Sequence, residues 1–409
     1  VSGAQALTVQ TSTAATSAIS FNGNVGTPPA LTPLGAITIA DGYNVTFNGS
    51  INAASITQTD GANDTTFTGA VSTTGAITIT AANDITFSGT VSATSITQAA
   101  GSGTTTFTGN ATTNGAAGIA ITTSNITLDG LTMTAGTTAG ADIALTGTVT
   151  LSSAAVEIVA QDTITVTGTV DGAQPFTATS ANNADIEFTN RIGETNELAS
   201  LTINGGNITL NGIGDNLGSG VTFTIPGTGT ISVTSTGFIA LNADHYRSDR
   251  AQTWTATTGG VRYLATGNGT WSAGGTGISC PGTDVYLDHA GQTLTLGADL
   301  SCRSLYFYRG ALSLPSRTIE TTQHLVLFGS VYSADDPEWT GADTRYGYYH
   351  GAPLAYYPTG AVYGASTVTF NAPGLPSAAF AAGGLNASTL TVGGNFYVNG
   401  TNMNVGAFT

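Results

Sequence analysis

The sequence predicts an all-β protein, a right-handed parallel β-helix (β-solenoid) with coils of about 20 residues and almost no α-helix. Three observations support this fold. Residues 35–74 align without a gap on residues 75–114, with about half of the positions identical, which indicates an internal repeat. Phenylalanine recurs at one constant interval through the two copies. Short runs alternate between aliphatic residues and threonine, and no stretch shows the spacing of an amphipathic helix.

Residues 1–34 are expected to lead into the solenoid. They alternate like the later coils, apart from the proline-bearing GTPPALTP of residues 26–33. The opening VSGAQALTVQ contains neither a starting methionine nor the charged and apolar regions of a signal peptide. We therefore expect a processed product or a piece of a longer polypeptide.

Residues 35–240 are predicted to form a repetitive shaft. Short strands such as Ile37-Thr38-Ile39 point aliphatic side chains to one face and threonine to the other, and Gly, Asn and Asp suit the tight corners between strands. Antiparallel sandwiches also have frequent turns, but a fixed 20-residue spacing favours parallel coils stacked about 4.8 Å apart. The predicted inward core ladder consists of Phe47, Phe67, Phe87 and Phe107.

Residues 241–409, the decorated half, are predicted to continue the solenoid with larger side chains and longer insertions. Thirteen of the fourteen tyrosines, all three tryptophans, all four histidines and both cysteines lie beyond residue 240. The segment 333–360 is too irregular for a coil, and long loops on a repeat scaffold usually carry recognition. The candidate binding residues in this aromatic loop are Trp339, Tyr346, Tyr348, Tyr349, Tyr356 and Tyr357. Alternatively, these rings fold over an apolar flank of the solenoid.

Cys280 and Cys302 are separated by close to one coil. Stacked positions bring Cα atoms about 4.8 Å apart, so a structural disulfide between neighbouring coils is predicted. Two free buried thiols are the alternative. Two cysteines cannot build a four-ligand zinc site, and neither a GGxGxD nonapeptide nor an EF-hand loop occurs. We expect no metal and no other cofactor.

The charge balance limits the partners. The chain has eight arginines, no lysine and a net charge of −16, and positions 1–190 carry eleven acids and no base. Such a surface repels nucleic acids and anionic membranes. No apolar run reaches the length of a membrane-spanning helix, which needs roughly 18 residues or more. We therefore expect neither nucleic-acid binding nor membrane insertion.

Catalytic constellations are sparse, and no catalytic residue is predicted. Asp41, Asp60, Asp64 and Asp84 recur near the coil spacing, but they lie in turn contexts where aspartate hydrogen-bonds its own backbone. The densest ionisable cluster is DHYRSDR, residues 244–250, whose histidine could act as a base. The favoured interpretation is a solvated, mutually paired loop at a change of packing. No GxSxG elbow supports a serine nucleophile.

Outward threonines repeat as Thr-x-Thr, for example at Thr78/Thr80 and at Thr163/Thr165/Thr167. This pattern resembles the flat faces of ice-binding solenoids. The sequence shows no array sustained at one register, so we expect these threonines to supply β-propensity and solvation.

The GAITI, DITFSG and TTTFTG elements of residues 35–114 resemble the shafts of bacterial filamentous-haemagglutinin-type exoproteins and autotransporter passengers. As a pattern, the likeness extends to Leu241. It implies a right-handed parallel β-helix that is exported to the bacterial cell surface and used for adhesion or assembly. The sequence contains neither the amino-terminal secretion domain of such exoproteins nor an Arg-Gly-Asp motif, so two-partner secretion and integrin binding are unsupported.

The expected function is a structural or adhesive component of a bacterial cell-surface or extracellular filament. The final stretch still alternates and neither end reads as a specialised cap, so copies of the chain, or the continuation of a longer chain, are the expected partners. They would join through the solenoid ends and the decorated half, and surface glycans are a further expected partner. Two alternatives remain. A carbohydrate-active β-helix enzyme (lyase, hydrolase or tailspike-like) requires acids converging in a groove, and a carbohydrate-binding module requires exposed aromatics.

Overall fold

The chain is an all-β parallel β-solenoid with coils of about 22 residues in a computed structural model, so the predicted solenoid is confirmed. The structure describes residues 3–10, 17–26, 33–60, 63–80, 82–214, 230–248, 250–264, 267–313, 317–327, 361–365, 367–370, 378–381, 385–392, 396–399 and 403–408. No α-helix occurs among these residues. The chain divides into two compact units, Val1–Gly205 (unit 1) and Gly206–Thr409 (unit 2). The division at residues 34 and 240, drawn from composition, stays a prediction.

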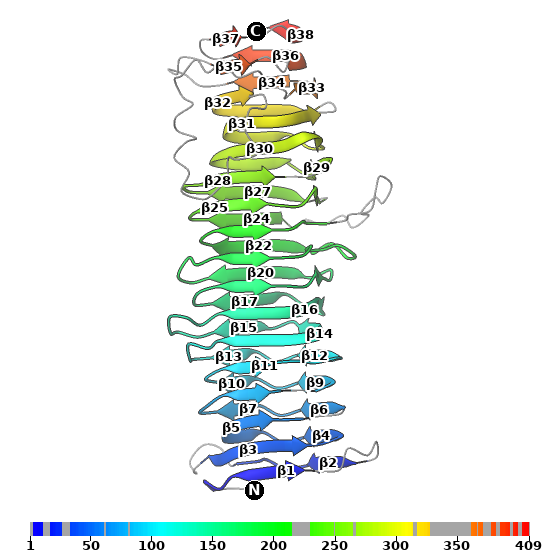
Figure 1. The fold of residues 1–409 in the computed structure, drawn as a ribbon, viewed down its shortest axis with the longest axis vertical. Coiled ribbons are helices and arrows are strands. Elements are labelled where there is room, and N and C mark those ends of the chain that lie inside the picture. Colours follow the sequence, from blue (N-terminus) through cyan, green and yellow to red (C-terminus); the bar gives the residue numbers. More distant parts are fainter. Residues whose placement is uncertain are drawn as a thin grey trace. The chain divides into compact units, whose positions relative to one another are not determined.

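Unit 1 consists of short strands that pair in parallel from one coil to the next (Figure 1). The two described strands that begin before residue 34 already belong to this stack, because they pair in parallel with strands of the following coil. The strands are β1 Leu7–Gln10, β2 Ala18–Phe21, β3 Leu34–Asp41, β4 Asn44–Phe47, β5 Ile51–Gln58, β6 Asp64–Phe67, β7 Val71–Thr73, β8 Ile77–Ile79, β9 Asp84–Phe87, β10 Val91–Ala93, β11 Ile96–Gln98, β12 Thr104–Phe107, β13 Ala111–Thr113, β14 Ile119–Asp129, β15 Thr132–Ala135, β16 Ile143–Ser152, β17 Val156–Ala160, β18 Ile164–Val166, β19 Val170–Asp171, β20 Pro175–Ser180, β21 Ile186–Phe188 and β22 Ser200–Gly205.

The core of unit 1 follows from the two-residue period of its strands. In β9, Ile85 and Phe87 are buried while Thr86 points outward, as alternation requires. The phenylalanines at this position stack in one column, with ring centroids 5.4, 4.9 and 4.9 Å apart from Phe47 to Phe107. Phe21 extends the column by one more ring at 4.7 Å. Four of the five rings are buried, so the ladder forms the centre of the core.

The 40-residue repeat has a physical basis in the core, because aliphatic and polar layers alternate. Val45 pairs with Thr65, which pairs with Ile85, which in turn pairs with Thr105. The sequence pattern placed threonine on the outward face, but Thr65 and Thr105 point inward and are buried. Thr105 Oγ1 donates a 2.6 Å hydrogen bond to Oε1 of the buried Gln98, which pairs the threonine hydroxyl with the amide oxygen inside the core.

Corner glycines allow the coils to approach closely. A Cβ atom at Gly49, Gly69, Gly89 or Gly109 would lie only 2.4–2.6 Å from backbone atoms of the preceding coil. No side chain fits in that space, so glycine after the phenylalanine position is a requirement of stacking rather than of a turn angle.

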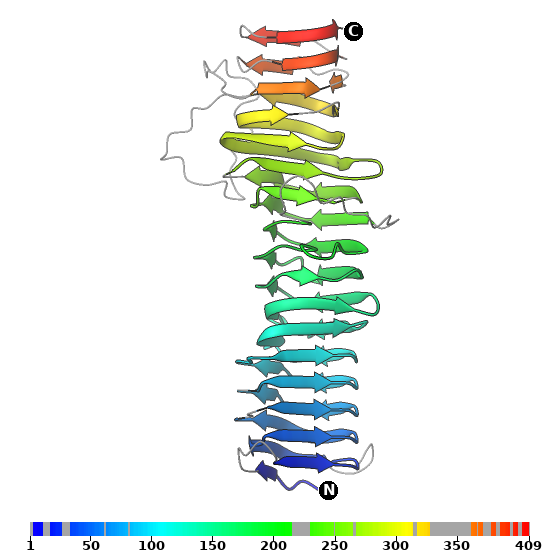
Figure 2. The ribbon, with the colours of Figure 1, turned by 90° about the vertical axis from the view of Figure 1, so that its right-hand side faces the viewer.

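Unit 2 is also a stack of parallel strands, drawn from green to red in Figure 2. The 20-residue spacing of unit 1 returns here, since Val285 pairs with Leu305 and Leu305 pairs with Leu325. The strands are β23 Ile208–Leu210, β24 Thr230–Ser235, β25 Phe238–Leu241, β26 His245–Arg247, β27 Ala251–Ala256, β28 Gly260–Leu264, β29 Gly269–Ser272, β30 Ile278–Leu296, β31 Leu300–Ser313, β32 Thr318–Leu327, β33 Ala361–Ala365, β34 Thr367–Phe370, β35 Ala378–Ala381, β36 Leu385–Val392, β37 Phe396–Asn399 and β38 Met403–Phe408.

Candidate functional site

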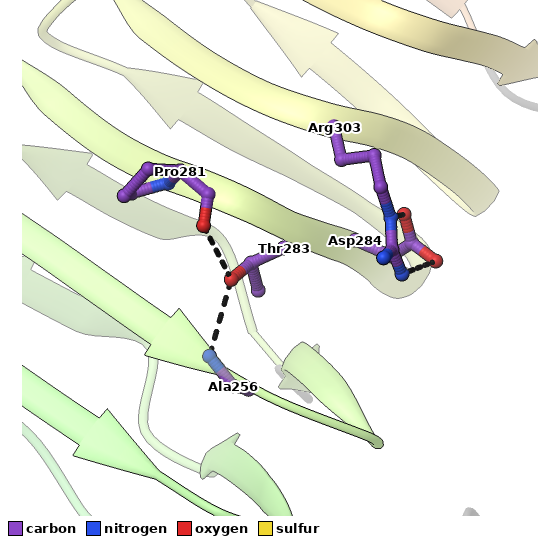
Figure 3. Close-up of polar contacts among 5 residues, drawn as sticks. All are labelled: Ala256, Pro281, Thr283, Asp284 and Arg303. Atoms are coloured by element: carbon purple, nitrogen blue, oxygen red, sulfur yellow. Dashed lines mark hydrogen bonds and ion pairs between the residues drawn. The ribbon is translucent and has the colours of Figure 1, made fainter.

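The long strands β30 and β31 of unit 2 carry a fork-shaped ion pair. Arg303 Nε and Nη2 donate to the two carboxylate oxygens of Asp284 at 2.7 and 2.8 Å (Figure 3). Two parallel hydrogen bonds fix the guanidinium in the plane of the carboxylate. The hydrogen bond to Asp284 raises the pKa of Arg303. Both side chains are only partly exposed, so the ion pair is partly shielded from water and links two neighbouring coils.

Beside the ion pair, Tyr286 and Tyr306 are register partners whose rings stack at 5.0 Å and 14°. Burial raises the pKa of both phenols, and that of Tyr306 rises to about 12. Neither phenol ionises near neutral pH, so neither can serve as a base there. The aromatic–ionic patch formed by Asp284, Tyr286, Arg303 and Tyr306 is suited to binding or packing rather than to proton transfer.

Thr283 secures an irregularity in β30 next to this patch. Its hydroxyl donates to the carbonyl of Pro281 at 3.2 Å and accepts from the amide of Ala256 at 3.1 Å (Figure 3). The pairing of β30 with β31 shifts register between Cys280 and Asp284. The buried hydroxyl satisfies a backbone donor that a regular ladder would have paired, so its role is structural.

The cysteines stack as predicted, but they are not bonded to each other. Cys280 on β30 and Cys302 on β31 are register partners, and both are buried and free. A disulfide needs Cβ atoms about 3.8 Å apart, whereas register partners in parallel strands stand side by side at roughly the 4.8 Å strand spacing. The predicted disulfide is therefore replaced in this structure by its alternative, two buried thiols.

Strands β26 to β29 each contribute one residue to a buried aromatic cluster, composed of Tyr246, Trp254, Tyr263 and Trp271. Neighbouring rings meet edge to face at 5.1 to 5.9 Å. The amide oxygen of Gln252 accepts hydrogen bonds from both indole nitrogens, at 3.1 and 2.8 Å. One buried amide thus satisfies two indole donors, as buried tryptophans require.

The DHYRSDR cluster is a packing corner. Tyr246 points into the core, and its hydroxyl donates to the carbonyl of Leu210 at 2.6 Å. Arg250 is also buried, which corrects the expectation of a solvated loop. Asp244 contributes backbone and carboxylate acceptors, to the Tyr263 hydroxyl and the Gly267 amide respectively. These contacts are structural, so a change of packing at this point accounts for the density of polar residues.

His289 on β30 is buried against the Tyr263 ring at 4.8 Å. Burial lowers its pKa to about 4, while the nearby carboxylates of Asp288 and Asp244 oppose the shift. The imidazole is therefore neutral at physiological pH and behaves as a core side chain.

Asp64 and Asp84 are the first residues of β6 and β9, and the hydrogen bond of Asp84 goes to the next coil and not to its own turn, where the sequence context predicts it. The Asp84 carboxylate accepts from the Thr104 amide at 2.6 Å. Asp64 is its register partner in the preceding coil, and burial together with the Asp84 charge raises the pKa of Asp64. Within the described part of the chain, no three His, Cys, Asp or Glu side chains gather where they could share a metal ion. Over the same residues, no helix has the length and apolarity needed to cross a membrane.

The aromatic loop lies outside the described residues, so its binding role at Trp339, Tyr346, Tyr348, Tyr349, Tyr356 and Tyr357 stays a prediction. Sequence reasoning did not single out the Asp284–Arg303 pair or the Tyr286–Tyr306 stack. A signal was present, because Tyr286 and Tyr306 are separated by one 20-residue coil.

These features define a β-solenoid repeat protein, and the fold alone gives the class. No known protein family matches the chain, and neither the curated proteins nor the solved structures contain a match.

Proposed function

We propose that the protein is a structural or adhesive component of a bacterial cell-surface or extracellular filament, assembled by coils that stack on one another. The resemblance of its shaft repeats to filamentous-haemagglutinin-type exoproteins and autotransporter passengers supports the extracellular setting. The observation that carries the assembly is Gly23. It occupies the corner position of the coil formed by β1 and β2.

The corner glycines explain why Gly23 is informative. At Gly49, Gly69 and Gly89, a Cβ would meet the backbone of the coil before it, within 2.6 Å. Gly23 has the same position after Phe21, yet nothing lies within 4 Å of a Cβ built there. Glycine is needed at this position only when another coil stacks on β1 and β2. That coil comes from a second copy or from a preceding segment of a longer chain.

The backbone at the same edge fits this interpretation. Among the described residues, β1 pairs only with β3, and β2 only with β4. Their other edges present unpaired amide and carbonyl groups, which act as a template for a further strand. A contact of this head-to-tail kind does not close on itself and therefore extends into a filament.

The test is the Gly23→Ala variant, examined by sedimentation over a concentration series and by electron microscopy. The added methyl should leave folding intact, because the space is open, but it should weaken end-to-end association. Thr8→Ser, an exposed change in β1 that adds no bulk, serves as the matched control and should assemble like the parent chain. Monodisperse particles from the parent chain at every concentration, or a Gly23→Ala variant that assembles equally well, would contradict the proposal.

Adhesion is assigned to the decorated half and its aromatic loop, with surface glycans as the ligand class, because exposed aromatics suit sugar rings. Deleting residues 333–360 should leave the shaft folded and weaken binding to bacterial surface polysaccharides. If the chain without residues 333–360 binds these polysaccharides equally well, the assignment is wrong. Cleavage of any such polysaccharide by the purified chain would instead favour the alternative, a carbohydrate-active enzyme.

A further inference from the structure

An uncharged face runs along unit 1 on seven successive coils, over β3, β5, β8, β11, β14, β16 and β18. Each coil contributes two outward positions, one on the strand and one two residues further along the chain. The face begins at Thr38 and Ala40 and ends at Thr165 and Thr167. Every position between these ends is threonine or alanine, and we call this surface the threonine face.

Backbone pairing shows that the first column of this face is in register. Thr38 pairs with Thr57, Thr57 with Thr78, and Thr78 with Thr97. The column continues through the alanines at 120 and 144 to Thr165. The expectation that the threonine arrays lack a sustained register is therefore wrong. Coils of unequal length hide the alignment in the sequence, because corner insertions change the numbering but not the pairing.

The second column continues the same ladder. Thr122 pairs with Thr146, and the amides of Thr59, Thr80 and Thr167 each donate to a carbonyl of the preceding coil at 2.8–2.9 Å. These residues are exposed, while threonines of the first column are half-buried between their neighbours. Among the described residues, the threonine hydroxyls of this face have no hydrogen-bond partner.

The composition of the face differs from that of an ordinary solvated surface. It contains methyl and hydroxyl groups only, with no charge and no aromatic ring across its seven coils. The column ends at Glu187, which pairs with Thr165 in the next coil. A sugar surface would be recognised by aromatic stacking, which this face cannot offer. Charged groups impose their own arrangement on the water molecules around them. Because this face has none, the spacing of its hydroxyl and methyl groups determines how water is ordered on it.

That spacing is fixed by the solenoid. Adjacent coils lie about 4.8 Å apart, and alternate residues along a strand lie about 6.6 Å apart, so hydroxyls and methyls form a rectangular grid. Water oxygens on a prism face of hexagonal ice repeat at spacings close to both values, so a rigid β-sheet with this grid presents a ready template. A preorganised surface also loses little entropy when it immobilises water.

We propose that the threonine face binds ice. Its hydroxyls take lattice positions, and the methyl groups hold water between them in an ordered layer. This inference stands on unit 1 alone and is independent of the filament proposal.

Three variants of the full chain test the proposal. Thr78→Lys and Thr122→Lys each place a charge in the face, whereas Thr86→Lys places the same charge on a different face, beside Asp84 on β9. All three positions point outward, and matching circular dichroism and thermal midpoints would verify folding. Thr122 is exposed, so its variant keeps the test informative when Thr78→Lys folds poorly.

The measurements are thermal hysteresis, inhibition of ice recrystallisation, and the fraction of protein incorporated into a slowly growing ice crystal. The parent chain and Thr86→Lys should enter the ice and retard recrystallisation, whereas Thr78→Lys and Thr122→Lys should be excluded from it. A folded parent chain without ice affinity would overturn the proposal, as would an equal loss in Thr86→Lys. Sedimentation tests whether a second copy of the chain covers the face instead. If the parent chain has no ice affinity and Thr122→Lys abolishes its self-association, the face is an interface between copies.

Discussion

Burial at individual residues decides which reactive groups of unit 2 are available. Cys280, Cys302, Tyr286 and His289 are chemically capable side chains, yet each has a pKa displaced toward its uncharged form, with burial as the main cause. Desolvation penalises the ionised state, so these groups remain neutral and pack like apolar ones.

The two thiols should be silent in the folded chain. Burial raises the pKa of Cys280 and of Cys302, so neither supplies the thiolate that alkylating reagents require. A thiol reagent should label neither residue under native conditions and both residues after denaturation without reductant. The reduced, denatured chain is the control and should show the same two labels. Labelling that appears only after reduction would show that the two cysteines form the disulfide after all.

Stability should fall in acid because of His289. Its pKa is about 4 in the folded chain against an ordinary value of 6.5, so between these values the unfolded chain holds a proton that the folded chain does not. The free energy of unfolding contributed by this residue therefore decreases as pH falls through this window, by about 3 kcal/mol in total. The measurement is denaturant unfolding of the parent and of His289→Leu at pH 7 and pH 4. Equal losses in both chains would contradict the assignment.

At the scale of the element, the stacking distance of a coil in unit 1 depends on its corner as much as on its strands. The strand residues supply an inward ring and outward threonines, but the distance between coils is reached only because glycine follows the phenylalanine position. Gly89 shows the constraint, since a Cβ there would lie 2.6 Å from the carbonyl carbon of Gly69.

Gly89→Ala should therefore destabilise unit 1 by about 1–3 kcal/mol or more, through forced separation of two coils. Gly23→Ala makes the same chemical change where nothing lies within 4 Å, and its effect should stay within about 0.5 kcal/mol. Denaturant unfolding and limited proteolysis of the two variants provide the comparison. Equal stability would show that the corner yields more readily than the contact distances indicate.

At the scale of the whole molecule, the net charge opposes the proposed self-association. A net charge of −16 with no lysine makes copies of the chain repel one another. Salt shortens the range of that repulsion from about 30 Å at 10 mM to about 8 Å at 150 mM. Sedimentation should therefore show stronger self-association at 150 mM than at 10 mM salt. A neutral osmolyte is the control and should not reproduce the effect, and association that weakens with salt would indicate attraction between opposite charges instead.

Most contacts of the candidate site could not be predicted from the sequence, and the physical cause can be identified. Cys280 and Cys302 were placed correctly by counting one coil, but the count gives Cα positions and not the Cβ distance on which a disulfide depends. Asp284 is in register with Ser304, so its ion-pair partner Arg303 lies one residue earlier, at the irregularity where the pairing of β30 with β31 shifts register. Such irregularities arise from packing and leave no periodic trace in the chain.

By itself, the sequence determined the parallel solenoid, the strand period and the buried phenylalanine column. Identical apolar residues that recur at a fixed spacing can all be buried together when successive coils stack and bring them onto one another. Tertiary structure decided which threonines turn inward to meet glutamine and which align into a continuous outward face. The reason is that hydrogen bonds between coils set the register, whereas corners absorb extra residues without disturbing it. The face from Thr38 to Thr167 therefore exists in the fold and is invisible at any constant spacing in the sequence.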